Sequence, residues 1–351
     1  MKPQQLLITL LMLVGVGCSP TPQANQSAKK TEQRNKENSI YYWKTVFDLN
    51  TTERSFLTEH HVKRLYLRLF DVVPGDNNPN NDYEIVPNAT ITLHDTMPEG
   101  VEIVPVVYIT LDALRLINSP KHNYAEIITQ RILNMADFND LGNIKEVQLD
   151  CDWTQKTQDT YFDFCRAMKE QLEPYGIQLS CTIRLWQLSC KCPPVDRGVL
   201  MLYNTGSITN PETNNSILDL NDVKAYLNGR PYGLPLDYAY PIYSWYVCFR
   251  NNTYMGLFHE QPGNDKDIET GDTVRHEYVS FHDLQGLDSI MRQNMPDAEN
   301  ASIILYHLDS ANLSKYSTDE IRQICKPLGR YHPVEFYTKS VAATRDSSLD
   351  C

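Results

Sequence analysis

The sequence is short of positive charge and of the motifs that mark several common enzyme classes. Its 351 residues include 32 Lys and Arg against 44 Asp and Glu, a formal net charge of −12. Proteins that bind nucleic acid neutralise phosphates with basic patches, so this balance argues against a nucleic-acid partner. The chain also lacks G-x-S-x-G, H-E-x-x-H and G-x-x-x-x-G-K-[ST]. Serine hydrolase, zinc peptidase and P-loop functions therefore have no support.

Long apolar runs are equally scarce, and the one that is present lies at the N-terminus. Residues 6–16 follow Lys2 and form an apolar run of 11 residues, too short to cross a bilayer as a helix and typical of a secretory signal. Gly17-Cys18 resembles the cleavage site of bacterial lipoproteins. That resemblance implies a signal peptide over residues 1–17 and a lipid on Cys18; an ordinary signal peptide with an incidental cysteine is the alternative.

The residue after the cysteine indicates the compartment. Ser19, rather than Asp, favours the outer membrane. We therefore expect a protein of the bacterial cell envelope that a lipid anchors to the membrane without spanning it. Residues 18–38 are nearly free of apolar side chains and cannot bury a core, so they are interpreted as a flexible tether. Residues 39–351 remain for one folded domain, a length typical of a (β/α)8 barrel.

Cysteine motifs that bind metals are missing as well. Cys190-Lys191-Cys192 lacks the C-x-x-C spacing of zinc sites, and no paired motif occurs elsewhere. Cys151, Cys181 and Cys248 lie inside apolar strands, where buried free thiols are the simplest interpretation. An exported chain could still pair some of its cysteines. The sequence predicts no metal and no cofactor.

Short runs rich in β-branched and aromatic residues recur along the domain. They cover residues 40–47, 63–72, 102–110, 146–154, 178–188, 198–207, 236–247 and 302–310. Segments with helical periodicity lie between most of them, at 52–62, 124–138, 160–176, 217–229 and 281–295, and a last one follows at 317–329. This alternation predicts an α/β fold, an irregular (β/α)8 TIM barrel. An open doubly wound sheet is the alternative.

Two segments make the predicted barrel irregular. Residues 73–101 resemble a loop with an extra strand (ATITLHD) rather than a helix, and SCKCPPVDRG after the fifth run leaves no room for a full helix.

The fourth run, EVQLDCDWT (146–154), ends in two carboxylates. Alternation puts Asp150 and Asp152 on the face opposite the apolar side chains. If the apolar face meets the helices, both carboxylates point to the barrel mouth, where TIM-barrel active sites lie. Their Cα atoms are roughly 6.5–7 Å apart, so the two groups could act together. A solvated strand end or an ion pair with Arg68 or Arg184 is the alternative, and the deeper Asp150 is the better candidate to hold an arginine.

Other strand ends carry side chains of the kind that bind sugars. Aromatic rings stack on the apolar faces of sugars, and charged groups bond their hydroxyls. The candidate substrate-binding residues are Arg68, Arg184, Trp186, Tyr203, Asn204, Tyr243, Trp245, His307 and Asp309. Because glycoside cleavage uses a pair of carboxyl groups, Asp150 and Asp152 are the catalytic candidates, and a carbohydrate is the expected partner.

Two of these strand ends resemble a known family. LDCDWT resembles the fourth-strand motif D-x-x-D-x-D-x-E of glycoside hydrolase family 18, the chitinase-like barrels, which often has Trp before the Glu. LMLYNTG resembles its sixth-strand motif M-x-Y-D, with Met201 and Tyr203 matching and Asn204 replacing the Asp. The resemblance implies a TIM barrel that acts on glycans. The strand set is also similar to a group of barrel lipoproteins from gut-type Bacteroidetes, which implies the fold and the compartment but no activity.

The chain departs from that family at the catalytic acid. With Trp153 on the family's Trp, Thr154 stands where the family has its Glu. A shift of two residues places Asp152 there instead but loses the Trp match. Three functions stay open: a glycoside-hydrolase-like enzyme, a non-catalytic glycan-binding lipoprotein on a decayed hydrolase barrel, and a structural lipoprotein without a small-molecule site. A cleft lined by Trp186, Tyr243 and Trp245 would disfavour the third.

Overall fold

A computed structural model describes residues 37–76, 82–262, 268–296 and 298–325. The predicted signal peptide, Cys18 and nearly all of the predicted tether lie outside these residues, as does the segment 326–351. Among the described residues, no helix combines the length and the apolar character needed to cross a membrane.

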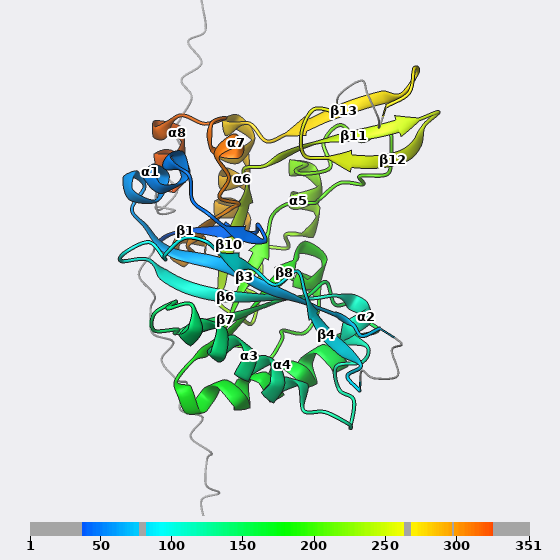
Figure 1. The fold of residues 1–351 in the computed structure, drawn as a ribbon. Coiled ribbons are helices and arrows are strands. Elements are labelled where there is room, and N and C mark those ends of the chain that lie inside the picture. The colour runs from blue at the N-terminus through cyan, green and yellow to red at the C-terminus, as the bar shows by residue number, and fades with distance from the viewer. Residues whose placement is uncertain (1–36, 77–81, 263–267, 297, 326–351) are drawn as a thin grey trace, which may run out of the picture. The chain divides into compact units, whose positions relative to one another are not determined.

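Eight parallel strands close into a barrel (Figure 1). They are β1 (Asn38–Tyr42), β3 (Val62–Pro74), β6 (Glu102–Ile109), β7 (Glu146–Asp150), β8 (Gln178–Arg184), β9 (Arg197–Met201), β10 (Leu236–Pro241) and β14 (Ile303–Tyr306). The barrel is closed because β1 pairs in parallel with both β3 and β14. Every predicted strand run overlaps one barrel strand. The irregular (β/α)8 barrel is therefore confirmed, and the open sheet is wrong.

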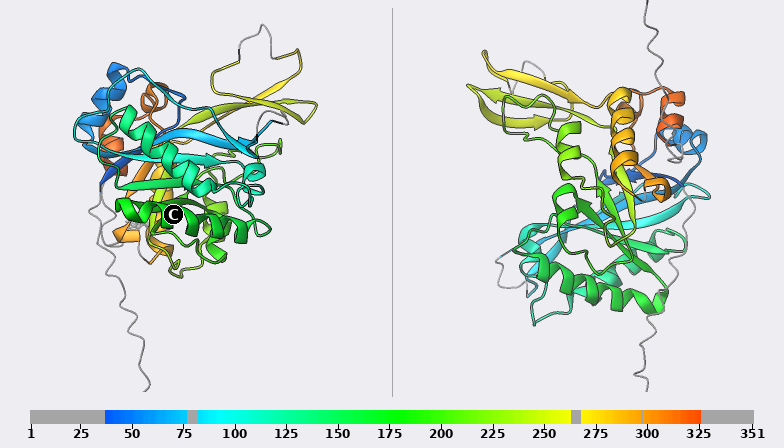
Figure 2. Two further views of the ribbon diagram at one scale, coloured as in Figure 1. Left: turned by 60° about the horizontal axis from the view of Figure 1, so that its bottom comes forward. Right: turned by 180° about the vertical axis from the view of Figure 1, so that it is seen from behind.

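Helices follow most of the barrel strands and cover the outside of the barrel (Figure 2). The longer ones are α1 (Thr51–Glu59), α3 (Tyr124–Phe138), α4 (Gln158–Leu172), α5 (Leu220–Tyr226), α6 (Phe281–Asn294) and α8 (Thr318–Ile324). The short ones are α2 (Leu111–Leu114), α7 (Ser310–Leu313), η1 (Glu173–Tyr175), η2 (Leu185–Ser189) and η3 (Ala298–Asn300). Reciprocal capping boxes at Asn50, Ser280 and Ser317 satisfy the first backbone donors of α1, α6 and α8.

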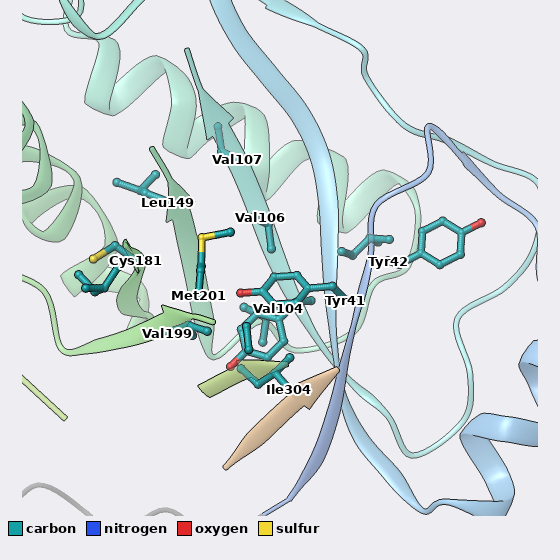
Figure 3. Packing of buried hydrophobic residues seen from close by; sticks show 14 of the residues in the cluster. Tyr41, Tyr42, Val104, Val106, Val107, Leu149, Cys181, Val199, Met201 and Ile304 are labelled. Atoms are coloured by element: carbon teal, nitrogen blue, oxygen red, sulfur yellow. The ribbon is translucent and has the colours of Figure 1, made fainter. Parts of the chain in front are cut away.

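The strand β7 shows which face of the sheet is the barrel interior. Gln148 accepts a hydrogen bond of 2.7 Å from the Tyr41 hydroxyl of β1, on another side of the barrel. Beyond the other face, Trp153 packs against Tyr161 of α4 with ring centroids 6.0 Å apart. The predicted alternation is confirmed: polar side chains point inward and apolar ones meet the helices. Figure 3 shows part of the resulting core, with Tyr41 among the barrel strands.

The irregular segments are also as predicted. After β3 the chain forms β4 (Ile85–Asn88), which pairs antiparallel with β3, and β5 (Thr92–Leu93), which pairs with β2 (Val46–Phe47). Only η2 follows β8. Every cysteine of the described residues is unpaired, which confirms the free-thiol interpretation of Cys151, Cys181 and Cys248.

The seventh predicted strand, 236–247, is wrong in its extent. Its first half is β10, but its second half starts β11 (Ser244–Arg250), which leaves the barrel. There β11 pairs antiparallel with β12 (Thr253–Phe258) and β13 (Thr273–Tyr278). One run of apolar and aromatic residues suits both environments, because β10 is almost fully buried and β11 is partly buried. The two halves are recognised as separate strands only from the strands with which each of them pairs.

Candidate functional site

Asp150 and Asp152 lie at the C-terminal end of β7 but in different surroundings. Asp150, the last residue of the strand, is 3% exposed and accepts a 2.6 Å hydrogen bond from the Thr182 hydroxyl of β8. Burial raises the pKa of Asp150 to about 6, with the Asp152 charge adding to the rise and Arg184 opposing it. Asp152 lies just beyond the strand with a side chain that is 48% exposed. One carboxyl group is thus deep in the mouth and the other is at its rim.

Arg184, at the end of β8, binds the outer carboxylate. Its Nη2 lies 2.9 Å from Asp152 Oδ2, and its Nε donates to the other oxygen, so the pair is bidentate. The expected ion pair of this site is therefore present, but the expectation that Asp150 holds the arginine is wrong. The long Arg184 side chain reaches the rim, while the Thr182 hydroxyl satisfies the deeper carboxyl group.

Arg68 makes its ion pair within its own strand. Its Nε and Nη2 donate to the two carboxylate oxygens of Asp71 at 2.8 and 2.5 Å. Residues three apart on a regular strand face opposite sides of the sheet. Here the pairing of β3 with β6 shifts between Arg68 and Phe70, so Leu69 is an extra residue and both charged side chains point the same way. Alternation alone could not predict this pair.

Aromatic rings from four strand ends meet at the mouth. Tyr306, the last residue of β14, lies 4.8 Å from Tyr203, 5.6 Å from Tyr243 and 5.6 Å from Trp43, measured between ring centroids. The Tyr203 hydroxyl is buried and has no hydrogen-bond partner in the described part of the chain. Sequence reasoning missed Trp43 and Tyr306, because an aromatic residue at a strand end is more often part of the core.

A cavity of about 380 Å³ opens beside these rings. Its lining is Asp152, Arg184, Leu185, Trp186, Met201, Tyr203, Asn204, Thr205 and Tyr226. Five predicted site residues therefore come together: Asp152, Arg184, Trp186, Tyr203 and Asn204. Tyr226, at the end of α5, carried no sequence signal because it lies on a helix.

Three of the remaining candidates surround the cavity without lining it. Asp150 lies deeper in the mouth, and the Tyr243 hydroxyl donates to Asn204 Oδ1 at 2.7 Å. Trp245 lies on β11, packs on Tyr243 with centroids 5.2 Å apart, and donates from Nε1 to Glu277 of β13 at 2.6 Å. The cleft thus contains only one of the three aromatic residues that were expected to line it.

His307 and Asp309 belong to a separate polar cluster beside α1 and α7. Asp309 caps α7 by accepting from the backbone of Ala311 at 3.0 Å, and its carboxylate lies 3.0 Å from Lys44 Nζ. Lys44 also binds the fully buried Glu53 at 2.7 Å. Burial lowers the pKa of His307 to about 4, so its ring is neutral at physiological pH. Neither residue lines the cavity.

Thr154 is held in the turn between β7 and α4. Its backbone N–H donates to the Thr157 hydroxyl at 2.9 Å, and the two hydroxyls are 3.3 Å apart. No carboxylate stands at this position. Among the described residues, no group of three or more His, Cys, Asp or Glu side chains is placed to hold a metal ion.

Comparison with known proteins identifies the fold. No family model and no curated protein matches the sequence. A chitinase from Chromobacterium violaceum superposes with a TM-score of 0.54 and 10% identity, over 84% of this chain and 98% of that one. The Ostrinia furnacalis Group IV chitinase in complex with allosamidin has a TM-score of 0.50 and 11% identity, over 83% and 98%.

A bacterial spore enzyme extends the comparison. The spore cortex-lytic enzyme SleL of Bacillus megaterium has a TM-score of 0.50 and 12% identity, over 82% of this chain and 74% of that one. Such low identities show the fold alone. The comparison therefore shows that this chain shares its (β/α)8 barrel fold with these chitinases and with SleL.

Proposed function

We propose that this protein binds a carbohydrate at the C-terminal mouth of its barrel. One observation carries the proposal: the cavity of about 380 Å³ places the half-buried Trp186 ring beside the Asp152–Arg184 pair and Asn204. Such a lining offers an apolar face for a sugar ring together with acceptors and donors for its hydroxyls. The shared fold with the chitinases agrees with this ligand class but does not by itself assign it.

The charges at the cavity favour an uncharged ligand. Arg184 and Asp152 neutralise each other through two hydrogen bonds, so neither presents a free charge to the cavity. A charged ligand would have to break this pair, whereas sugar hydroxyls can bind its outer edges. A structural lipoprotein without a small-molecule site would not need such a cavity.

Binding fits the geometry better than cleavage. A glycosidase needs one carboxyl group that can donate a proton to the leaving oxygen. Both oxygens of Asp152 are engaged by Arg184, and Thr154 has no carboxyl group to offer. We therefore rank glycan binding without cleavage, on a hydrolase-type barrel, as the first candidate function.

Cleavage is the second candidate, and the state of Asp150 favours it. Its pKa of about 6 lies well above that of an ordinary carboxyl group, while Asp152 is next to an arginine. Two neighbouring carboxyl groups in such different surroundings can divide the roles of acid and ionised partner. Asp150 would then donate the proton, although it is almost fully buried.

A glycan array with the purified protein, followed by a reducing-sugar assay on every glycan that binds, tests both candidates. Trp186→Ala should lose binding because the stacking surface is removed. Phe138→Ala is the matched control, since Phe138 is an 88% exposed aromatic residue at the end of α3. Binding without sugar release supports the first candidate, and release that Asp150→Asn abolishes supports the second. No binding to any glycan would refute both.

We also propose that a lipid on Cys18 anchors this domain to the bacterial outer membrane. The support is the apolar run before Gly17-Cys18 and the Ser19 that follows. An anchored barrel would present its mouth to glycans at the cell envelope.

A further inference from the structure

A second cavity lies between α1 and the turn that precedes β6. Its volume is about 370 Å³, close to that of the cavity at the mouth. Its lining includes Val62, the first residue of β3, and Val101, which directly precedes β6. Because all the parallel strands start at the same end of the barrel, this cavity reaches the end opposite the mouth.

One wall of this second cavity is apolar, and one of its charges is already neutralised. Leu49, Leu57 and Val62 line it and are buried. Arg54 donates from Nε to the Leu49 carbonyl at 3.1 Å and pairs with Asp95 at 2.5 Å. The arginine therefore helps to form the wall and offers little net charge to a ligand.

Lys63 and Glu99 supply the two charges of this cavity that a ligand can reach. Within the described residues neither side chain makes a hydrogen bond or an ion pair, although both line the same cavity. Opposite charges that share a cavity without pairing suit a ligand that carries both complementary charges. The cavity therefore matches a zwitterion better than an anion, which the formal net charge of −12 also disfavours.

Two turns carry the polar side chains of this cavity. His61 follows α1 with φ +49°, a left-handed conformation in which glycine is the usual residue. A histidine held there is a candidate for function, and it adds an imidazole to the lining. Glu99 is the second residue of a turn in which the Val101 N–H donates to the Pro98 carbonyl at 3.3 Å, and Gly100 supplies the positive φ at the third.

The predicted tether enters the domain beside this cavity. Asn38, the first residue of β1, is in register with Val62 and donates from Nδ2 to the His60 carbonyl at 2.6 Å. His60 and Val62 flank His61 in the chain. If Cys18 carries a lipid, only the tether separates this end of the domain from the bilayer, and a flexible chain of about 20 residues spans roughly 25 Å. Membrane headgroups are then at high local concentration, so a weak site is enough to hold them.

We propose that this cavity binds the phosphoethanolamine headgroup of a membrane phospholipid. Lys63 and His61 bind the phosphate, Glu99 binds the ammonium group, and the apolar wall contacts the carbon atoms of the headgroup. The described residues of the lining include a carboxylate but no Phe, Tyr or Trp. They therefore suit a primary ammonium group, which donates hydrogen bonds, better than the quaternary group of choline, which aromatic rings bind. The inference goes beyond the glycan site and rests on the proposed anchor alone.

Co-sedimentation of the full-length Cys18→Ser chain with phospholipid vesicles tests the proposal. This chain has no lipid of its own, so the result does not depend on the anchor. Vesicles of mixed phosphatidylethanolamine and phosphatidylcholine should bind it about fivefold more tightly than vesicles of phosphatidylcholine alone, the size expected of two exposed ionic contacts. Soluble glycerophosphoethanolamine should compete with the mixed vesicles, whereas glycerophosphocholine should not.

The double variant Lys63→Gln, Glu99→Gln removes one charge of each sign, so the net charge is unchanged. Added to the Cys18→Ser chain, it should bind both kinds of vesicle equally. Glu99→Gln alone should also lose the preference, and it is the second variant if the double variant folds poorly. The matched control is Asp163→Asn, Arg166→Gln, which neutralises an exposed pair on α4 and should keep the preference.

Two results would overturn the headgroup site: equal binding or no binding of the Cys18→Ser chain to the two kinds of vesicle, and a preference that survives in the folded double variant. Binding of glycerophosphoethanolamine without any preference between the vesicles would overturn the membrane lipid as its source. None of these results bears on the glycan site, which the glycan array tests, and labelling with palmitate decides separately whether Cys18 carries a lipid.

Discussion

Replacing Asp150 by Asn should stabilise the protein at neutral pH. Asp150 is 3% exposed, and burial is the main reason that its pKa rises from 3.8 to about 6. Because this folded-state pKa lies above the unfolded one, the native state prefers the protonated carboxyl group. The stability that Asp150 contributes is therefore present below the unfolded pKa and lost as the pH rises through about 6. Because the pKa is higher by about two in the folded state, folding disfavours the ionised form of Asp150 by ~3 kcal/mol.

Urea unfolding of wild type and Asp150→Asn across about pH 4 to pH 8 measures this effect. The two proteins should be equally stable near pH 4, and the variant should be more stable by up to ~3 kcal/mol near pH 8. Asn keeps an oxygen that accepts from the Thr182 hydroxyl, so the existing hydrogen bond survives. Other titrating groups cancel in the difference between the two proteins.

Asp163→Asn is the matched control for this comparison. Asp163 lies on α4 with a side chain that is 60% exposed and pairs with Arg166 at the surface. The free energy of unfolding of Asp163→Asn should differ little from that of the wild type at every pH. If the difference between Asp150→Asn and wild type did not change between pH 4 and pH 8, the raised pKa of Asp150 would be refuted. A variant destabilised at pH 8 would show instead that Asp150 holds a positive charge.

Three further predictions concern the rim carboxylate, the anchor and the tether. Asp152→Asn should abolish the glycan response but lower the free energy of unfolding by no more than about 1 kcal/mol, because this carboxylate is half exposed. If the variant does not fold, the Asp152–Arg184 pair serves the structure alone. Cys18→Ser should release the protein from membranes and end incorporation of labelled palmitate; unchanged labelling would disprove the anchor. Deletion of residues 19–35 should leave the melting temperature unchanged in a calorimetric scan, since that segment has almost nothing apolar to bury, and a fall of many degrees would contradict the tether.

The sequence by itself determined the barrel and the direction of its polar faces. Strand and helix patterns are local, because a period of two or of 3.6 residues is carried by neighbouring side chains. The eight runs therefore each found one barrel strand, and the alternation in β7 placed Asp150 and Asp152 at the mouth. The resemblance of two strand ends to the chitinase-like barrels agreed with the fold.

Only the tertiary structure decided which side chains meet. Arg68 faces Asp71 because one extra residue in β3 changes the register against β6, and no local pattern contains that partner strand. Arg184 extends from β8, the strand next to β7. The position of β8 in the folded chain determines that the arginine reaches Asp152 rather than Asp150. Trp245 lies on β11 outside the barrel, because an apolar run does not specify with which strands it will pair. Contacts between strands depend on register and partners, and these are properties of the folded chain rather than of any one segment.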